Sequence, residues 1–253
     1  MAEERIWTAA LVVIGDEILS GRTQDRNVAQ LATWLNAQGI RLAEVRIVPD
    51  VEAAIVEALN ALRIRNDYCF TTGGIGPTHD DITVDAVAAA LGVPVVIHPE
   101  ARAALERYYE TRGGITDTRL RMARVPEGAE LIPNRMSGAP GIRVGDRLFV
   151  LAGVPHIAAQ MLDALTGTLE GGLPLVSHTV GCWVPESEIA ELLARTERAF
   201  EGVAIGSYPL FREGRVGANF VIRATSQAVV DACAAALTAA LVEAGREAVD
   251  GGI

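Results

Sequence analysis

Lysine is absent from this sequence, and all 22 of its basic residues are arginine. An enzyme that forms a Schiff base needs a lysine amine, and a Walker P-loop places a lysine on the phosphates that it binds, so both classes are excluded. The 32 acidic residues give a net charge of −10 at pH 7. Because a phosphate backbone or an anionic bilayer binds to positive surfaces, we expect neither nucleic acid nor a membrane as a partner.

Cysteines are few, and long apolar runs are missing. Cys69, Cys182 and Cys233 are isolated, without any CxxC pair, so we expect neither a disulfide framework nor a thiolate zinc site, and small buried side chains instead. No apolar run approaches the roughly 18 residues that span a bilayer, and the first residues are acidic where a secretory signal is basic. We expect a cytoplasmic protein.

What the sequence does contain is apolar runs that alternate with amphipathic stretches. Residues 8–14 and 68–72 have the composition of strands buried on both faces, which is typical of a parallel sheet. Helices are predicted after both, and Asp50 is expected to cap another helix that follows a strand at 42–48. The prediction for residues 1–171 is therefore a doubly wound, mostly parallel α/β domain.

The glycine- and proline-containing segment 171–174 is the predicted domain boundary. Beyond it, residues 175–253 have a strand, helix, strand, strand, helix order, which predicts a small α+β domain. Gly214–Gly217 is a literal GxxG, the pattern with which KH domains clamp nucleic acid, but it falls between two predicted strands. Six arginines stand against ten acids from Leu175 onward, so RNA binding is not expected.

Asp16 and Glu17 follow the first predicted strand directly. In an open α/β sheet, ligands bind at the carboxyl ends of the strands. A carboxylate pair there suits Mg²⁺, which takes one or two carboxylates together with phosphate oxygens. The alternative is a turn in which Asp16 and Ser20 satisfy backbone donors.

A glycine-rich loop follows the strand at 68–72. Gly73, Gly74 and Gly76 let backbone approach a ligand, and the helix that begins after the loop presents its positive dipole end there, which predicts phosphate binding. The loop is neither GxGxxG nor a P-loop. Asp80 and Asp81 would repel a phosphate unless a cation intervened. The alternative is that either acid is only a helix N-cap.

These two motifs, Gly15–Leu19 and Thr72–Thr83, together resemble the MoaB/MogA molybdopterin-binding superfamily, with the closest likeness to the amino-terminal region of the competence/damage-inducible protein CinA. They are also similar to the pterin-binding-like domain of eukaryotic FAD synthases. Ile205–Pro209 resembles the KH-like segment of CinA-type chains. The amidase domain of full CinA proteins has no counterpart here, so deamidation is not expected. Supporting matches are Pro126–Ala129, Asn134, Gly138–Gly141 and Gly153–Pro155.

The resemblance implies a small phosphorylated ligand, molybdopterin or a nucleotide. It also implies that Asp16 and Asp81 hold Mg²⁺ or another divalent cation and act in catalysis. Ala152–His156 departs from the family's Pro-Gly-Val-Pro-Glu, which alters the rim of the pocket. The residues expected to contact the ligand are Gly15, Glu17, Thr72, Gly73, Gly74, Gly76, Thr78, Asp80, Gly138, Gly153 and Pro155.

The function that this resemblance implies is metal-dependent hydrolysis of a nucleotide pyrophosphate such as ADP-ribose or FAD. Two alternatives stay open at this point: a non-catalytic pterin- or nucleotide-binding module, and an adenylyltransferase of molybdenum cofactor synthesis. Members of the superfamily commonly assemble, and the chain is 50% hydrophobic, so we also expect a homo-oligomer.

Overall fold

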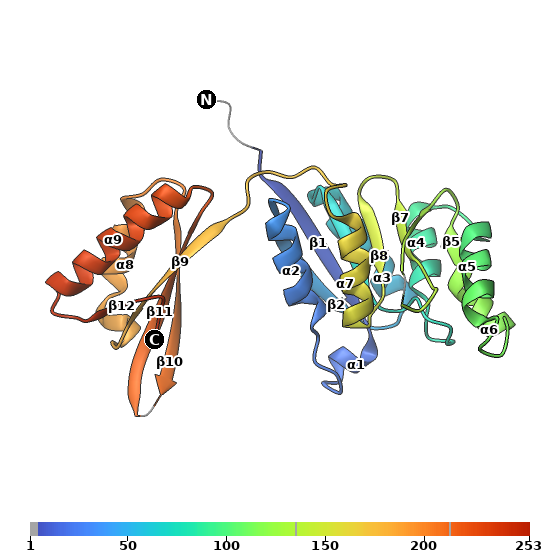
Figure 1. The fold of residues 1–253 in the computed structure, drawn as a ribbon, viewed down its shortest axis with the longest axis horizontal. Coiled ribbons are helices and arrows are strands. Elements are labelled where there is room, and N and C mark those ends of the chain that lie inside the picture. The colour runs from blue at the N-terminus through green and yellow to red at the C-terminus, as the bar shows by residue number, and fades with distance from the viewer. Residues whose placement is uncertain (1–4, 135, 213) are drawn as a thin grey trace. The chain divides into compact units, whose positions relative to one another are not determined.

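The computed structural model describes residues 5–134, 136–212 and 214–253, and the chain divides into two compact units, 1–172 and 173–253 (Figure 1). The elements of the larger unit are β1 (Trp7–Ile14), α1 (Asp16–Leu19), α2 (Asn27–Ala37), β2 (Ile40–Val48), α3 (Glu52–Arg65), β3 (Tyr68–Thr72), α4 (Thr83–Leu91), β4 (Val95–Ile97), α5 (Pro99–Tyr109), α6 (Asp117–Leu120), the 3₁₀ helix η1 (Arg121–Ala123), β5 (Arg124–Pro126), β6 (Glu130–Ile132), β7 (Gly141–Val144), β8 (Leu148–Leu151) and α7 (Pro155–Leu165).

The sheet of the larger unit has the order β2-β1-β3-β8-β7-β6. Strands β2, β1, β3 and β8 pair in parallel, as the apolar runs predict. Strands β7 and β6 pair antiparallel at the other edge, so the α/β fold is confirmed but its sheet is mixed. A separate two-stranded sheet, β4 with β5, was not predicted either.

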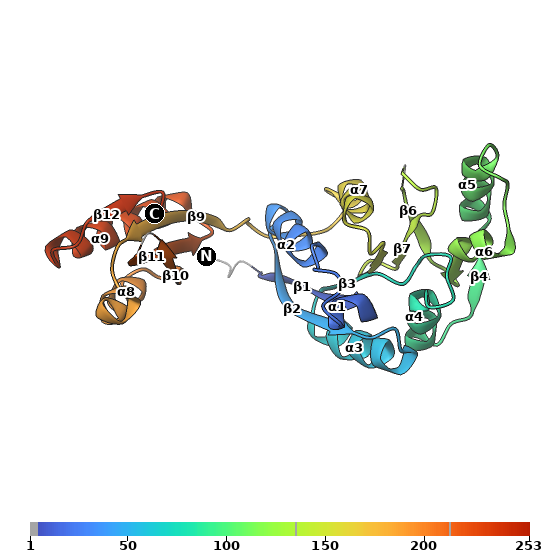
Figure 2. The same ribbon diagram turned by 90° about the horizontal axis from the view of Figure 1, so that it is seen from below.

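Helices cover both faces of the sheet, with α2 and α7 on one side and α3 and α4 on the other (Figure 2). Along β1, alternate side chains serve the two layers. Leu11 and Val13 pack with Leu31 of α2 and Met161 of α7, whereas Val12 packs with Ile55 of α3. Because both faces are buried, the strand is a continuous apolar run, which is the pattern that the sequence shows.

Asp67 ties the starts of β1 and β3 together, since its Oδ2 accepts a hydrogen bond of 2.9 Å from the Thr8 N–H and its Oδ1 pairs with Arg5. Burial alone would raise the pKa of Asp67, but the Thr8 N–H and the Arg5 guanidinium outweigh it and hold the pKa below its ordinary value. A lowered carboxyl pKa contributes stability above the ordinary pKa and loses it as pH falls.

We therefore expect Asp67→Asn to lower the free energy of unfolding by about 1 kcal/mol at neutral pH, the scale of one partly exposed charged hydrogen bond. The difference should shrink as the pH is lowered to about pH 3, below the ordinary carboxyl pKa, and should vanish only below the lowered pKa of the folded protein, where the wild-type side chain is protonated too. Urea unfolding of both proteins at the two pH values measures it. A difference that persists unchanged in acid would contradict the assignment.

The smaller unit is an α+β domain whose elements are β9 (Val176–Cys182), the 3₁₀ helix η2 (Glu186–Glu188), α8 (Ala190–Arg198), β10 (Ala204–Arg212), β11 (Arg215–Ala224), α9 (Gln227–Glu243) and β12 (Ala248–Asp250). Its sheet is antiparallel with the order β10-β11-β9-β12, and β12 was not predicted. The core packs Phe220 of β11 against Leu237 of α9.

The GxxG motif, Gly214–Gly217, lies at the β10–β11 hairpin, not between helices. The Arg215 guanidinium stacks on the Trp183 ring at 4.3 Å, and a Cβ added at Gly217 would come within 2.9 Å of the same ring. Packing inside the domain therefore accounts for both residues. A KH-like character of this unit stays a prediction.

The three cysteines are free and buried, as expected of small core side chains, and burial raises the pKa of the Cys69 thiol to about 12. Such a thiol is not ionised at neutral pH and is therefore not a nucleophile. None of the helices in the described part of the chain has both the length and the apolar character needed to span a bilayer.

Candidate functional site at the carboxyl edge of the parallel strands

Four loops lie side by side where the four parallel strands end (Figure 1). Asp50 follows β2, Gly15–Glu17 follow β1, the glycine loop (Gly73–Asp81) follows β3, and Gly153–Pro155 follow β8. Strand β2, which follows β1 in the chain, lies on one side of the central β1–β3 pair. The strands of this sheet that follow β3, which are β6, β7 and β8, lie on the other side. This divergence is a topological switch point, where open α/β sheets bind ligands.

The glycine loop is tightly tied to its neighbours, which explains its composition. Gly73 and Gly74 have φ angles of 101° and 65°, and a Cβ at Gly73 would lie 2.1 Å from the Ile14 carbonyl oxygen. The Thr83 hydroxyl donates to the Gly73 carbonyl at 2.8 Å, and the Thr83 N–H donates to the Gly74 carbonyl at 3.0 Å. Only glycine fits at Gly73 and Gly74, and the loop is held against the start of α4.

Asp81 organises the glycine loop from within. Its Oδ1 accepts the Gly76 N–H at 2.7 Å, and its Oδ2 accepts the Thr78 N–H at 2.7 Å and the Thr78 hydroxyl at 2.5 Å. Helix α4 has Ile82 as its N-cap residue, without a side-chain bond, so Asp81 caps the loop and not the helix. Both oxygens of Asp81 thus already accept hydrogen bonds. The role of Asp81 as a metal ligand stays a prediction.

Some of the loop amides predicted to bind phosphate are already bonded. The Gly73 N–H donates to the Leu151 carbonyl at 3.2 Å, and those of Gly76 and Thr78 donate to Asp81. The amides of Gly74 and Ile75 make no hydrogen bond within the described part of the chain. Both are therefore available to a phosphate.

The cap predicted for Asp50 was wrong. The residue that precedes α3 as its N-cap is Val51, and Asp50 Oδ2 instead accepts a hydrogen bond of 2.9 Å from the Asp16 N–H. Burial raises the pKa of Asp50, and the nearby carboxylates of Asp16, Glu17 and Asp80 raise it further, although the bond from Asp16 acts in the opposite direction. Asp50 thus lies near three other acids, and we call the four the acidic cluster: Asp16, Glu17, Asp50 and, within the glycine loop, Asp80.

The acidic cluster fits a divalent cation of the Mg²⁺ type. The negative charges that raise the pKa of Asp50 are relieved by a bound cation. Among the described residues no three acidic, histidine or cysteine side chains converge closely enough to form a complete metal cage. Mg²⁺ needs none, because it keeps waters and takes only one or two carboxylates together with phosphate oxygens. The Asp16 main-chain N–H donates to Asp50 Oδ2, so Asp16 and Asp50 are the neighbouring acids that would hold such a cation.

A small hollow of about 60 Å³ opens between the ends of β1, β3 and β8. We call it the Asn27–Thr72 hollow; it is lined also by Glu17, Gly153 and Pro155. The Asn27 Nδ2 donates to the Gly153 carbonyl at 2.8 Å, whereas Asn27 Oδ1 and Thr72 Oγ1 are buried without a partner in the described parts of the chain. Four predicted site residues therefore meet here, together with Asn27, which belongs to no motif and was not predicted from its place in the first turn of a helix.

A second, very small hollow lies on the other side of the glycine loop. Gly76 and Asp81 line it together with Arg121 and Arg124. Arg124 forms an ion pair with Asp85, its Nη1 lying 3.1 Å from Asp85 Oδ2, but the buried Nε of Arg121 has no partner among the residues that the structure describes. Arg121 thus offers an uncommitted positive charge beside the loop.

The remaining predicted residues have structural surroundings. Gly138, at φ 72°, packs on Tyr108 of α5, since a Cβ there would lie 2.7 Å from the Tyr108 Cβ. Gly15 lies under the Glu17 carboxylate, whose oxygens would come within 2.6 Å of an added Cβ. A Cβ at Gly153 would lie 3.1 Å from the Gly73 Cα, so the loops after β3 and β8 touch.

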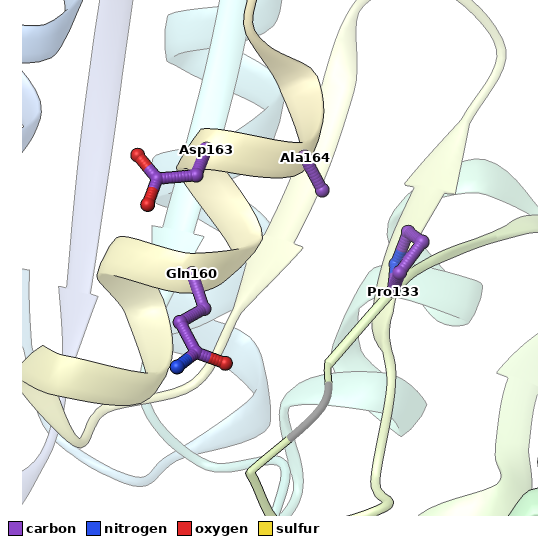
Figure 3. Close-up of a pocket in the computed structure, with 4 residues that line it drawn as sticks. All are labelled: Pro133, Gln160, Asp163 and Ala164. Carbon is purple, nitrogen blue, oxygen red and sulfur yellow. The ribbon is translucent and has the colours of Figure 1, made fainter.

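Wider hollows exist away from this edge. One of about 460 Å³ is lined by Pro133, Gln160, Asp163 and Ala164, and Figure 3 shows Gln160 and Ala164 of α7 facing Pro133 while Asp163 points away from it. Another of about 510 Å³ lies along α2 and α7 and is mostly apolar, with Trp34 and Leu162 in its lining. Neither gathers converging buried polar groups, so size alone does not make either the candidate site.

Comparison with known proteins finds a matching family model for each of the two units. Residues 10–171 match the family model described as a probable molybdopterin binding domain, and residues 174–249 match that of the FAD synthase middle domain. A protein of Aeropyrum pernix is 35% identical over 215 residues, covering 81% of this chain and 79% of that protein.

A CinA-like protein of Citrifermentans bemidjiense is 38% identical over 193 residues, covering 73% of this chain and 46% of that protein. The chain thus spans about half the length of the CinA-like relatives. The crystal structure of a CinA protein of unknown function from Thermoplasma acidophilum has 31% sequence identity and a TM-score of 0.59, over 63% of this chain and 96% of that one. The chain therefore belongs to the MoaB/MogA-like molybdopterin-binding domain family, close to the amino-terminal region of CinA.

Proposed function

We propose that this chain is a divalent-metal-dependent hydrolase that cleaves the phosphoanhydride bond of a nucleotide pyrophosphate such as ADP-ribose or FAD. The observation that carries the proposal is the acidic cluster around Asp50, set directly beside a loop with free backbone amides. A phosphate that accepts hydrogen bonds from the loop lies near four carboxylates. The phosphate and the carboxylates are all negatively charged, so a cation between them is needed to offset their repulsion.

Different groups of the chain bind the phosphates, hold the cation and position the glycine loop. The amides of Gly74 and Ile75 and the guanidinium of Arg121 bind the phosphates, and the start of α4 directs its positive dipole end toward them. Asp16 and Asp50 hold the cation, and Asp81 keeps the loop in shape. When bound, Mg²⁺ would supply neutralisation of the charge that develops on the phosphate oxygens.

The reaction is a hydrolysis without a redox step. A water oxygen bonds to one phosphorus, the bond from that phosphorus to the bridging oxygen breaks, and the bridging oxygen leaves with the other phosphate. A proton of the water passes to a carboxylate of the acidic cluster. ADP-ribose would give AMP and ribose 5-phosphate.

A thermal-shift screen of ADP-ribose, FAD, ATP and molybdopterin precursors, each with and without Mg²⁺, tests the proposal. A ligand that binds only the native state raises the melting temperature. We expect a nucleotide and Mg²⁺ together to raise it more than the sum of their separate shifts. A second candidate, a pterin-binding module without chemistry, is favoured by the family description of residues 10–171. Shifts with pterins alone, independent of Mg²⁺, would select it.

Asp81→Asn is expected to destabilise the protein by about 1–3 kcal/mol, because an amide has one acceptor oxygen and its NH₂ group would face the Gly76 or the Thr78 N–H. Asp80→Asn is the matched control, since the Asp80 side chain is 64% exposed and its loss should change stability by less than about 0.5 kcal/mol. Urea unfolding compares the two variants. Equal stability would show that Asp81 does not hold the loop.

Homo-oligomer assembly stays a prediction of the sequence, as does cytoplasmic localisation. The mostly apolar hollow along α2 and α7 is the surface that we expect such an assembly to use. An adenylyltransferase would use the same loop and cation, and it would differ from the proposed hydrolase in joining, not cleaving, the phosphoanhydride.

A further inference from the structure

The core of the smaller unit lies on one face of its sheet, where Val180 of β9 and Phe220 of β11 pack with residues of α8 and α9. Because side chains alternate along a strand, the adjacent residues Gly181 and Asn219 lie on the opposite face, where they pair with each other across the two strands. We call this the outer face of the sheet. The segment Gly251–Ile253, which follows β12, lies on it.

Asn219 holds this segment by its main chain. Its side-chain Oδ1 accepts the Ile253 N–H at 2.8 Å, and its Nδ2 donates to the Ile253 carbonyl at 3.2 Å. The Gly251 N–H donates to the Thr179 carbonyl of β9 at 2.9 Å. An amide that bonds to both the N–H and the C=O of one residue takes the place of a neighbouring strand, and it can do so for any residue except proline.

Two strand glycines make room for the segment. A Cβ at Gly181 would lie 2.7 Å from the Ile253 nitrogen, and a Cβ at Gly217 would lie 2.5 Å from Ile253 Cδ1 and 2.9 Å from the Trp183 ring. Neither glycine has a positive φ, so close approach and not backbone conformation requires them. A glycine inside a strand weakens it and often marks the close approach of another backbone. The outer face is thus shaped to receive a main chain and one apolar side chain.

The contacts also define what the outer face accepts. Gly251 and Gly252 have φ angles of 77° and 102°, which favour glycine, and a Cβ at Gly252 would lie 2.8 Å from Asn219 Oδ1. The next residue places an aliphatic side chain over Gly217. The sequence that fits is therefore two glycines followed by an aliphatic residue.

We propose that the outer face is a peptide-binding site for the sequence Gly-Gly-aliphatic, and that this chain covers the site with its own segment. The contacts involve main-chain atoms and one side chain of the occupant, so none of them needs a covalent link to the sheet. Gly251 is exposed, and Gly252 and Ile253 are only half-buried. The segment can therefore leave while β12 stays paired with β9, and a partner protein's segment of the same chemistry takes its place.

An NMR titration tests this proposal with the peptide acetyl-Asp-Gly-Gly-Ile-amide. It compares the wild-type chain with a chain from which residues 251–253 are deleted. A tethered segment competes at an effective concentration on the order of millimolar, so we expect the deleted chain to bind the peptide about 10-fold or more tightly than the wild type. The side-chain amide signals of Asn219 should shift on binding. Acetyl-Asp-Gly-Gly-Asp-amide, which lacks the aliphatic side chain, should bind about 10-fold more weakly.

Ile253→Gly gives the same information without shortening the chain. It removes only the aliphatic side chain of the covering segment, so the wild-type fold is kept and the competition is weakened. We expect this variant to bind the peptide more tightly than the wild type does, by up to about 10-fold. The melting temperature of each protein shows whether it is folded.

Gly181→Ala, made in the deleted chain, tests the site itself. Its Cβ would occupy the position of the main-chain nitrogen of the bound aliphatic residue, so peptide binding should fall by about 10-fold or more. Gly206→Ala is the matched control. Gly206 lies on the outer face in β10, and the atoms nearest to an added Cβ belong to the side chains of Tyr208 and Arg223. This variant should bind the peptide like the deleted chain that carries no substitution.

Two results would overturn the peptide-binding site. One is no binding of the peptide either to the folded deleted chain or to Ile253→Gly. The other is equal affinity of the wild-type and deleted chains for the peptide, which would place the peptide away from the outer face. Both results leave the proposed hydrolysis untouched, since it uses residues of the larger unit only.

Discussion

Asp50→Asn is expected to reduce Mg²⁺-dependent turnover of a nucleotide pyrophosphate by roughly 100-fold or more, the scale on which loss of a charge contact at the transition state acts. The variant removes one negative charge from the acidic cluster and keeps the shape of the side chain. An asparagine oxygen can still accept the Asp16 N–H, which Asp50 Oδ2 accepts at 2.9 Å. The loss of activity should therefore occur without loss of fold.

The stability of Asp50→Asn without metal separates this explanation from simple damage. Burial and the neighbouring carboxylates raise the pKa of Asp50, so its ionised form is disfavoured in the folded protein. Removing the charge should leave the melting temperature equal to or above that of the wild type, while the increase caused by Mg²⁺ is lost. Asp16→Asn should behave in the same way with respect to Mg²⁺.

Asp163→Asn is the matched control for the loss of one carboxylate. Asp163 is exposed on α7, at the hollow shown in Figure 3, away from the acidic cluster. This variant should keep both turnover and the Mg²⁺-dependent shift. Full turnover in Asp16→Asn and Asp50→Asn would remove both residues from the catalytic site.

Gly73→Ala should destabilise the protein more than any of the carboxylate substitutions, lowering the free energy of unfolding by more than about 3 kcal/mol. Two costs combine: a φ of 101° that a residue with a Cβ rarely adopts, and a Cβ only 2.1 Å from the Ile14 carbonyl oxygen. Since the clash is with backbone, no side-chain rotation relieves it. A backbone shift that relieved the clash would move the loop and weaken binding of a phosphate ligand.

Gly92→Ala isolates the steric part of this effect. Gly92 ends α4 at φ 69°, and an added Cβ there meets nothing within 4 Å. It should therefore cost only about 1 kcal/mol, the penalty of the left-handed backbone. Urea unfolding of both variants measures the difference. If the two cost the same, the contact between Gly73 and β1 is looser than the distance of 2.1 Å implies.

The sequence predicts the centre of the larger unit well because its signals there are local and repeated. Apolar runs such as Leu11 to Ile14 can be accommodated only in a strand buried on both faces, and Gly73 and Gly74 can follow a strand only in a turn that needs positive φ. The resemblance to the MoaB/MogA superfamily rests on the segments that follow these strands, Gly15–Leu19 and Thr72–Thr83, and the family is confirmed.

The misses share a physical cause, which is that their determining contacts are distant in sequence. Strands β4 to β7 are three or four residues long, too short for alternation to be recognised, and they form through pairing with partners elsewhere in the chain. Strand β12 follows the same rule, since it exists through its pairing with β9. No local window contains both partners.

Asp50 and Asn27 were missed for a similar reason. An acid between a strand and a helix has a satisfactory local explanation as a cap, and only the fold reveals that its partner is the Asp16 N–H, 34 residues away. Asn27 opens α2 without any motif, and its Gly153 partner lies 126 residues away. The predicted phosphate contacts of Gly76 and Thr78 are similarly altered by Asp81, whose bonds to their amides follow from the loop's three-dimensional path.

Phosphorus NMR of the wild-type protein with ADP-ribose, followed before and after addition of Mg²⁺, tests most directly whether the acidic cluster and the glycine loop together hydrolyse a nucleotide pyrophosphate. We predict that the pyrophosphate signals persist without the cation. After its addition they should be replaced by two phosphomonoester signals, at a rate that Asp50→Asn lowers by roughly 100-fold. Pyrophosphate signals that persist in Mg²⁺ with both ADP-ribose and FAD, or an Asp50→Asn variant as active as the wild type, would contradict the proposed hydrolysis.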